Sequence, residues 1–401
     1  MYFMHFRRRL IEDILLKRMK IFPVLGIIGP RQVGKSSFLM KQWCPRHRAQ
    51  YLTLDKLEVA TRARRAPEQL ILSSSSDAQQ HLVIDEIQKV PHLFDSLKAI
   101  VDEHPGVGKF TVTGSVNFSL KSGVRESLAG RIGITRLFPL ILSELYSSKS
   151  ARPFINGQFK WASEYPTSAV KIWLERGGMP LFCKFQDTVE RHNAISSWLD
   201  AICYRDLNQF KDGSYDGDLA MQILKAIARN SSIVISRFAA EHGVSAKIVE
   251  RHLNSLEALL LVYRIPSVSN PRARPAYRIF DSGVISFLTH HREEQECHHS
   301  TLVTFVMNEI LAQNEYAGHD KFRIFYYRER GGAEVDLVFE GDKIMLGIEC
   351  LLTADVSEYR QRGMKSFLKR YPQAKGVFVA PVTQGYEINK RMQVVPWGAV
   401  G

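Results

Sequence analysis

An apolar segment that leads directly into a glycine-rich loop constrains the fold more than any other part of this sequence. Val24–Ile28 is followed by Gly29, and Gly34, Lys35 and Ser36 complete the spacing GxxxxGKS. At this spacing backbone N–H groups converge on phosphate oxygens, the lysine reaches the terminal phosphates and the hydroxyl ligates Mg²⁺. The run from Ser36 to Trp43 predicts a helix whose N-terminal dipole faces the same anion. The predicted contacts with the nucleotide are Gly29, Pro30, Arg31, Gln32, Val33, Gly34, Lys35, Ser36 and Ser37.

A second apolar run ends in two carboxylates. Leu82–Ile84 is followed by Asp85, which at a strand tip can hold Mg²⁺ together with Ser36, and by Glu86, which can deprotonate the attacking water. The alternative is a buried strand that ends in a solvated acidic turn. The acidic pair follows the phosphate loop and a further strand, YLTLD. This order favours a role in ATP hydrolysis over a solvated turn.

The first part of the chain alternates between strands and helices. The predicted strands are Val24–Ile28, Tyr51–Leu54, Leu82–Asp85, Phe110–Thr113 and Ile132–Leu137, with helical stretches such as Phe94–Asp102 between them. This alternation predicts an α/β fold, a parallel sheet with helices on both faces and the ligand at the carboxyl ends of the strands.

Three further residues are candidates for contact with the γ-phosphate. Ser115 and Asn117 follow the strand FTVTGS and can sense the phosphate, although Gly-Ser-x-Asn is also ordinary turn chemistry. Arg131, in SLAGRI, can stabilise transition-state charge within its own chain or in a neighbouring subunit of a homo-oligomer. The alternative for Arg131 is a surface position without a catalytic role.

Size and charge limit the other possibilities. A chain of 401 residues is expected to form several domains, and a net charge of +13 favours a polyanionic partner, nucleic acid before an acidic membrane surface. Simple solubility is the alternative explanation of the charge. Five scattered cysteines without CxxC spacing favour a reducing cytoplasm. No apolar run is long enough to span a bilayer. Arg7–Arg9 are expected in a solvated basic turn, and contact with nucleic acid or lipid is the alternative.

The middle of the chain has the spacing of a winged helix. After a helical connector at 151–215, residues 216–282 predict three helices followed by a hairpin. The side chains expected to face DNA are Lys247, Arg251 and His252 on the third helix and Arg272 and Arg274 in the hairpin loop. Packing or docking of a protein partner is the alternative.

The last part, residues 283–401, resembles the PD-(D/E)xK nuclease fold. A helix carries Glu309, and two strands carry Asp336 and Glu349. In such a site the acids bind Mg²⁺ and a lysine two positions after the glutamate stabilises hydroxide, but this chain has Leu351 there. The interpretation is a degenerate nuclease-like module used for binding. An active Mg²⁺-dependent nuclease, with Lys343 as a relocated lysine, is the alternative.

Several segments together resemble a large group of prokaryotic AAA-type ATPases with a C-terminal domain of uncharacterised function. They are GPRQVGKSS, VIDEIQKVPHLF, VTGSVNF, SLAGRIGITRLFPLILSEL, ERGGMPLF, YRDL, RIFDSGVISFL and YYRERGGAEVDLVFE. The resemblance implies ATP bound by Gly29–Ser36, Mg²⁺ at Ser36 and Asp85, and catalysis by Glu86, and it adds a phosphate-directed role for Arg131.

The sequence therefore predicts an ATPase domain at 1–150 that couples its nucleotide state to the binding of DNA or a protein partner. The alternatives are an ATP-regulated nuclease and a scaffold that holds ATP without hydrolysing it.

Overall fold

The computed structural model describes residues 6–74, 81–117, 128–147, 161–210, 213–289, 299–319, 322–341 and 344–401. Two compact units make up the chain. The first consists of Met1–Ala151, Ala258–Leu260 and Glu315–Gly318, and the second of Arg152–Glu257, Leu261–Asn314 and His319–Gly401. The predicted division of the second unit into a connector, a winged helix and a nuclease-like domain stays a prediction. No described helix is long and apolar enough to cross a membrane.

The first unit contains a five-stranded parallel sheet in the order β2-β3-β4-β1-β5. The strands are β1 (Val24–Ile28), β2 (Gln50–Thr53), β3 (Leu82–Asp85), β4 (Phe110–Gly114) and β5 (Ile132–Arg136). Strand β4 lies between the other two central strands, because Val112 pairs with both Gly26 of β1 and Ile84 of β3. All residues of β1, β3 and β4 are buried, as expected when helices cover both faces. The predicted α/β fold with a parallel sheet is confirmed.

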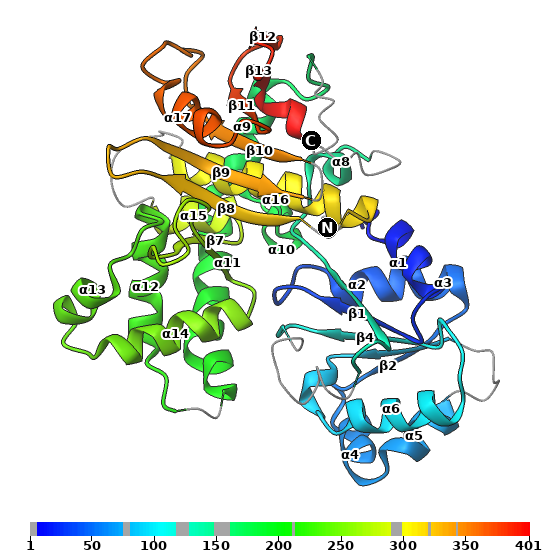
Figure 1. Ribbon diagram of the computed structural model, residues 1–401. Coiled ribbons are helices and arrows are strands. Elements are labelled where there is room, and N and C mark those ends of the chain that lie inside the picture. The colour runs from blue at the N-terminus through cyan, green and yellow to red at the C-terminus, as the bar shows by residue number, and fades with distance from the viewer. Residues whose placement is uncertain are drawn as a thin grey trace. The chain divides into compact units, whose positions relative to one another are not determined.

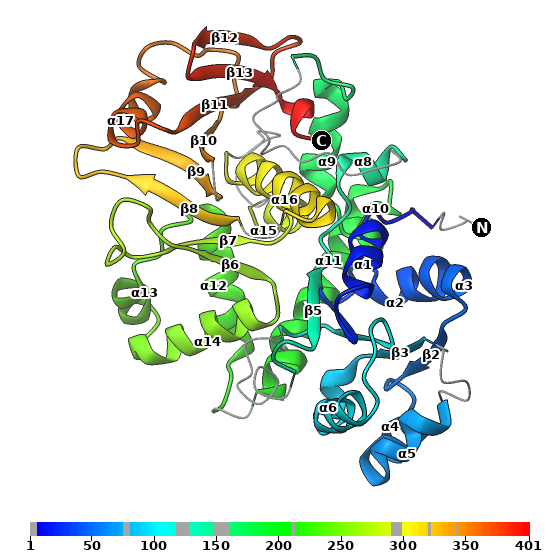
Figure 2. The ribbon, with the colours of Figure 1, turned by 45° about the vertical axis from the view of Figure 1, so that its right-hand side comes forward.

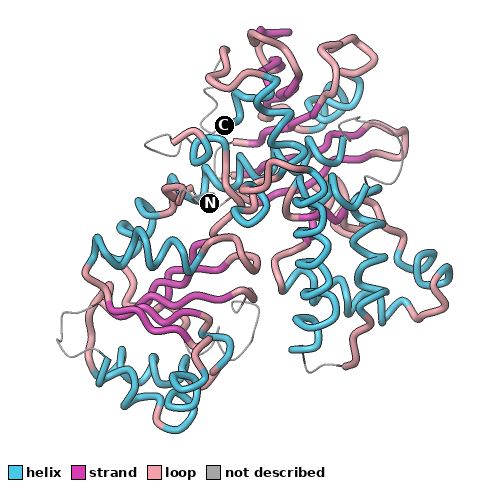
Figure 3. Tube along the Cα trace, turned by 180° about the vertical axis from the view of Figure 1, so that it is seen from behind, coloured by secondary structure: helices cyan, strands magenta, loops and turns pink. Residues whose placement is uncertain are grey.

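Helices cover both faces of this sheet (Figures 1 and 3). On one face lie α1 (Glu12–Met19) and a continuous helical run made of α2 (Lys35–Phe38), a π-helical turn (Leu39–Trp43) and α3 (Cys44–His47). On the other lie α4 (Leu57–Arg65), α5 (Pro67–Ser74) and α6 (Leu93–Glu103). The apolar side chains of these three helices pack on β1, β3 and β4 in one buried cluster. This packing fixes the carboxyl edge of the sheet, where the phosphate loop and a short helix, α8 (Leu142–Leu145), follow their strands.

The second unit begins with helices. They are α9 (Thr167–Arg176), α10 (Pro180–Cys183), α11 (Thr188–Ala201), α12 (Gly217–Arg229), α13 (Ile235–Glu241), α14 (Ala246–Ala258) and α15 (Ser282–Thr289). Between α14 and α15 the chain forms an antiparallel hairpin of β6 (Val262–Ile265) and β7 (Ala276–Ile279). The order of three helices and a hairpin is the one expected for residues 216–282.

A six-stranded mixed sheet completes the second unit, in the order β12-β13-β11-β10-β9-β8 (Figure 2). Helix α16 (His299–Ala317) precedes it, and α17 (Arg362–Arg370) connects β10 to β11. The strands are β8 (Arg323–Arg328), β9 (Glu334–Glu340), β10 (Met345–Cys350), β11 (Lys375–Ala380), β12 (Tyr386–Asn389) and β13 (Met392–Pro396). Helix α17 packs closely on the sheet, because a Cβ atom at Gly347 would lie 2.7 Å from the Phe367 ring.

Candidate nucleotide-binding site

The glycine-rich loop joins β1 to α2 at the carboxyl edge of the parallel sheet, as predicted. Gln32 and Gly34 have φ angles of 64° and 103°, in the left-handed region that favours glycine. At Gly29 a Cβ atom would lie 2.6 Å from the carbonyl oxygen of Leu137 and 2.9 Å from Val33 Cγ1. Any other side chain at Gly29 would therefore push the loop away from the segment that follows β5.

Lys35 is folded back onto this loop. Its Nζ donates to the carbonyl oxygens of Gly29, at 2.9 Å, and Pro30, at 3.0 Å, and the residue is buried. Burial lowers the pKa of the ammonium group, against the opposing charges of Glu86 and Asp85. An anion at the loop would favour the charged form of Lys35 and accept hydrogen bonds from its ammonium group.

Asp85, at the tip of β3, accepts hydrogen bonds from three hydroxyl groups. Ser36 Oγ lies 2.6 Å and the Tyr51 hydroxyl 2.5 Å from Asp85 Oδ2, and Thr113 Oγ1 donates to Oδ1. The structure thus brings together Ser36 and Asp85, the pair predicted to hold Mg²⁺. Tyr51 and Thr113 were not predicted. Their positions in β2 and β4, the two strands that flank β3, are the signal that could have identified them.

Glu86 is the next residue, and its backbone is strained. Its φ of 60° lies in the left-handed region, which costs a non-glycine residue ~1 kcal/mol. The Glu86 N–H donates to Thr113 Oγ1 at 3.1 Å, and the carboxylate accepts from Gln88 Nε2 and from Ser115 Oγ, the latter at 3.3 Å. This strained turn directs the Glu86 carboxylate toward Ser115 at the end of β4.

Ser115 and Asn117 have different surroundings. Ser115 Oγ also accepts from Gln88 Nε2 at 3.1 Å, so it belongs to the group that orients Glu86. The backbone N–H of Asn117 donates to the carbonyl oxygen of Ala258 at 2.7 Å. A phosphate-sensing role for either side chain stays a prediction.

Arg131 lies at the opposite edge of the sheet, which corrects the prediction of a role within its own chain. It precedes β5, and its carbonyl oxygen accepts from the N–H of Val24, the first residue of β1. At 3.3 Å per residue, β1 places this edge about 13 Å from the phosphate loop. The guanidinium instead forms a two-point ion pair with Asp102, at 2.6 and 3.1 Å. A residue before a parallel strand lies at the amino edge of the sheet, away from the phosphate loop of its own chain.

Arg9 was expected in a solvated turn but is only 3% exposed. Its Nε donates to Glu144 Oε1 at 3.0 Å, its Nη1 to the carbonyl oxygen of Val33 at 2.9 Å and its Nη2 to that of Phe138 at 2.5 Å. Arg9 therefore fixes the phosphate loop to the segment after β5. No local pattern marks this residue, because its partners lie far along the chain.

In the second unit, the predicted DNA-facing residues have three kinds of environment. Lys247, Arg272 and Arg274 are exposed. Arg251 is half-buried, donates to the carbonyl oxygen of Ser214 at 2.6 Å and lies over the Tyr215 ring. Its guanidinium is therefore engaged within the chain rather than directed outward.

His252, also expected to face outward, is fully buried, which corrects that prediction. Its Nδ1 lies 2.8 Å from the carbonyl oxygen of Ile248, and its Nε2 accepts from the N–H of Asp216.

The loop between β6 and β7, which carries Arg272 and Arg274, is fixed to the edge strand β8. The N–H of Val268 donates to the carbonyl oxygen of Tyr326, and the N–H of Tyr326 donates to that of Pro266, both at 3.0 Å. The loop therefore presents its arginines from a fixed backbone.

The predicted acidic site in the second unit is only partly formed. Asp336 Oδ2 accepts from His299 Nε2 at 3.0 Å and from the N–H of Cys350 at 2.9 Å. Burial tends to raise the pKa of Asp336, but the charges of His299 and Arg278 and the hydrogen bonds from His299 and the Cys350 N–H together lower it. Burial and the nearby Asp336 raise the pKa of Glu349 well above its usual range. The negative charge of Asp336 therefore opposes ionisation of Glu349.

Glu309 does not belong to this acidic group, which corrects the prediction. The residue of α16 that contacts Asp336 is His299. Glu309 lies ten residues after His299 on this helix, which is about 15 Å along the helix axis. Glu309 was assigned to this helix from the sequence, but His299, at the start of α16, was not identified as part of the site. Within the described residues no group of three His, Cys, Asp or Glu side chains is arranged to hold a metal ion. Lys343 lies outside the described residues.

Comparison with protein families agrees with the geometry of the first unit. Residues 22–146 match a family model described as an AAA domain. This part of the chain has the P-loop ATPase fold. Residues 168–292 and 301–400 match two different domains of unknown function.

Known proteins with similar sequences or structures add no activity for the second unit. Uncharacterized proteins of Mycobacterium bovis and Mycobacterium tuberculosis are each 24% identical over 399 residues, covering 93% of this chain and 80% of theirs. A solved Walker-type ATPase of Pyrococcus abyssi is 14% identical, with coverage of 70% of this chain and 94% of that one and a TM-score of 0.44.

Proposed function

We propose that the AAA domain binds ATP with Mg²⁺ and hydrolyses it. The observation that carries the proposal is the meeting of Ser36, Asp85 and Glu86 at one edge of the sheet, beside the glycine-rich loop. Loop N–H groups and Lys35 would bind the phosphates, and Lys35 would exchange its two carbonyl partners for phosphate oxygens.

The residues present fit Mg²⁺. The Ser36 hydroxyl and the Asp85 carboxylate are hard oxygen donors 2.6 Å apart, the ligand type that this ion prefers. When bound, the ion neutralises charge that develops on the phosphate oxygens. Tyr51 and Thr113 hold the Asp85 carboxylate in position by donating to its two oxygens.

Glu86 is the proposed general base. Its carboxylate is oriented by Gln88 and Ser115 and would take a proton from the attacking water. Replacement of Glu86 by Gln keeps the shape and removes the base, so ATP turnover is expected to fall by ~10²–10⁴ while nucleotide affinity is retained. Glu103→Gln, at the exposed end of α6, is the matched control and is expected to keep full turnover. Phosphate release measured on both variants tests whether Glu86 is the base. Unchanged turnover in Glu86→Gln would refute this assignment.

We further propose that the second unit binds DNA or a protein partner and that the nucleotide state controls this binding. The exposed side chains of Arg272, Arg274 and Lys247 support a polyanionic partner, as does the net charge of +13. DNA binding compared with and without a slowly hydrolysed ATP analogue tests the coupling. Equal affinity in both states would contradict it.

A further inference from the structure

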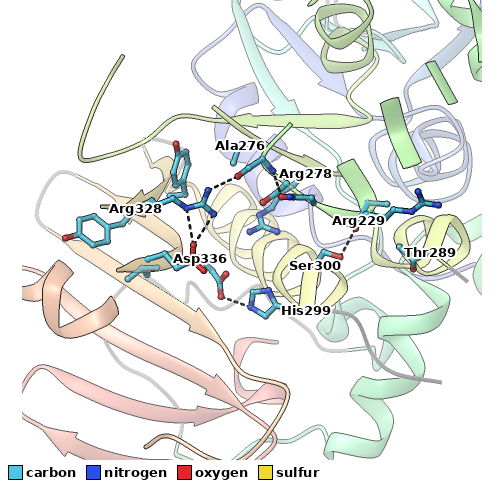
Figure 4. A pocket seen from close by; sticks show the side chains of 16 residues that line it. Arg229, Ala276, Arg278, Thr289, His299, Ser300, Arg328 and Asp336 are labelled. Atoms are coloured by element: carbon cyan, nitrogen blue, oxygen red, sulfur yellow. Dashed lines mark hydrogen bonds and ion pairs between the residues drawn. The ribbon is translucent and has the colours of Figure 1, made fainter. Parts of the chain in front are cut away.

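The second unit encloses a cavity of about 510 Å³ (Figure 4). The end of α12, strand β7, the start of α16 and the neighbouring strands β8 and β9 form its walls. Hydrogen bonds hold these walls together: the N–H of Tyr277 donates to the carbonyl oxygen of Ser231 at 2.7 Å, and Ser300 Oγ to that of Ala228 at 2.9 Å. The volume is that of a small-molecule pocket, for which ~300–1,000 Å³ is usual.

Arg278 is the unexplained residue of this cavity. It lies on β7, lines the cavity and is only 7% exposed. Among the described residues its Nε has no hydrogen-bond partner. Burial lowers the pKa of its guanidinium group, although the charge of Asp336 opposes this. A buried N–H without an acceptor is costly, so a ligand that accepts from Arg278 Nε would remove an existing penalty.

Other groups make the cavity suitable for an anion. Arg328 donates to Ser232 Oγ at 3.1 Å, and Arg229 is exposed at the end of α12. The long helix α16 begins at the cavity, and its N-terminal end carries partial positive charge. The two carboxylates in the wall are already paired, Asp336 with His299 and Glu334 with Arg328. The unmet hydrogen-bonding capacity is therefore on the cationic side.

We propose that this cavity, the arginine pocket lined by Arg229, Arg278, Arg328, Ser232, His299 and Tyr326, binds the phosphate group of a nucleotide. The nucleotide is either free or at the end of a nucleic-acid strand. A guanidinium fork matches two phosphate oxygens, which a compact lysine cannot do. The volume leaves room for a nucleoside, and the Tyr326 ring, with Arg328 at 5.9 Å from its centroid, provides a surface for stacking. This site is distinct from the phosphate loop and does not depend on ATP hydrolysis.

Calorimetry on the full chain tests the proposal in a Lys35→Ala background, which weakens phosphate binding at the other site. AMP is expected to bind with a stoichiometry of one, and adenosine is expected to give no heat. Arg278→Gln should weaken AMP at least tenfold and Arg328→Ala several-fold, as expected for hydrogen bonds to a charged group. Arg323→Ala is the matched control, because it removes an exposed arginine of the same strand that also pairs with a carboxylate, Glu340. It should leave AMP affinity unchanged.

Two oligonucleotides of one sequence, with a 5′-phosphate or a 5′-hydroxyl, distinguish the sources of the phosphate. Tighter binding of the phosphorylated strand, lost in Arg278→Gln, assigns the pocket to a strand end, and binding of AMP alone assigns it to a free nucleotide. Circular dichroism checks that the variants fold. If Arg278→Gln does not fold, the binding of AMP and of the phosphorylated strand is compared between Arg328→Ala, at an exposed position, and the control. The proposal is overturned if neither AMP nor the phosphorylated strand binds, or if the folded pocket variants bind like the control.

Discussion

Replacement of Arg9 tests whether the N-terminal segment holds the phosphate loop in place. Arg9 and Glu144 form an ion pair at 3.0 Å whose side chains are only 3% and 0% exposed. Glu144 also accepts from the N–H of Leu10 at 2.8 Å. Arg9→Met keeps the apolar length of the side chain and removes its hydrogen bonds to Glu144, Val33 and Phe138. The buried Glu144 carboxylate then has no counter-charge, for which the usual cost is about 3–5 kcal/mol.

A second substitution, at Glu144, shows how much of the lost stability comes from the uncompensated carboxylate. Glu144→Gln removes the negative charge and keeps an oxygen for Leu10. In Arg9→Met/Glu144→Gln, no uncompensated charge is left, so we expect about half of the loss to be recovered. Arg7→Met is the matched control: Arg7 is exposed and donates to the carbonyl oxygen of Leu145 at 2.8 Å. Loss of this hydrogen bond is expected to lower the free energy of unfolding by less than about 1 kcal/mol.

Urea unfolding of the full chain, followed by hydrogen exchange of peptides from the first unit, measures these free energies. ATP affinity measured on the same variants should fall for Arg9→Met, because Val33 loses the donor that fixes its carbonyl group. The reasoning is refuted if Arg9→Met is no more destabilising than Arg7→Met. It is also refuted if the double variant loses as much free energy as the two single variants combined.

Three other predictions follow from single residues. Burial raises the pKa of Asp281 to about 6 despite its backbone N–H donors, so its stabilising effect is full below the unfolded pKa and is lost as pH rises through 6. The stability difference between wild type and Asp281→Asn should therefore shrink by about 2 kcal/mol between pH 4 and pH 7, and a constant difference in urea unfolding would contradict this. Arg131→Ala should leave the ATP affinity of dilute protein unchanged in calorimetry, whereas a tenfold loss would show that it reaches its own site. Arg272→Ala and Arg274→Ala should each lower the salt slope of DNA binding by about 1, with the exposed Arg237→Ala as control, and unchanged slopes would exclude phosphate contact.

The phosphate loop could be predicted because its chemistry is local. Gly29, Lys35 and Ser36 lie within one short segment, and the rule that parallel strands end at the same edge of a sheet brings Asp85 to them. The same rule would have placed Arg131 correctly, because it precedes a strand instead of following one. Arg131 was assigned a role at its own phosphate site because it lies in the segment SLAGRI, although its position before a strand already indicates the amino edge of the sheet.

Long-range contacts could not be predicted in this way. Arg9 meets Val33 and Glu144 across large sequence separations, and a run of three arginines at a chain's start usually lies in solvent. His299 lies ten residues before Glu309 on the same helix, and spacing along the chain does not assign it to Asp336. Such residues are recognised only when packing is known, since burial rather than spacing gives them their role.

The surroundings of Glu349 bear on what the second unit does. A metal-dependent nuclease site needs ionised carboxylates and a cation near the attacking water. Here burial and the charge of Asp336 raise the pKa of Glu349 well above its usual range. Leu351, in the position of the lysine, is buried, and its carbonyl oxygen accepts from Trp397 Nε1 at 2.9 Å. On the adjacent side Arg278 lacks a hydrogen bond at Nε. These features support the binding role proposed above for the second unit.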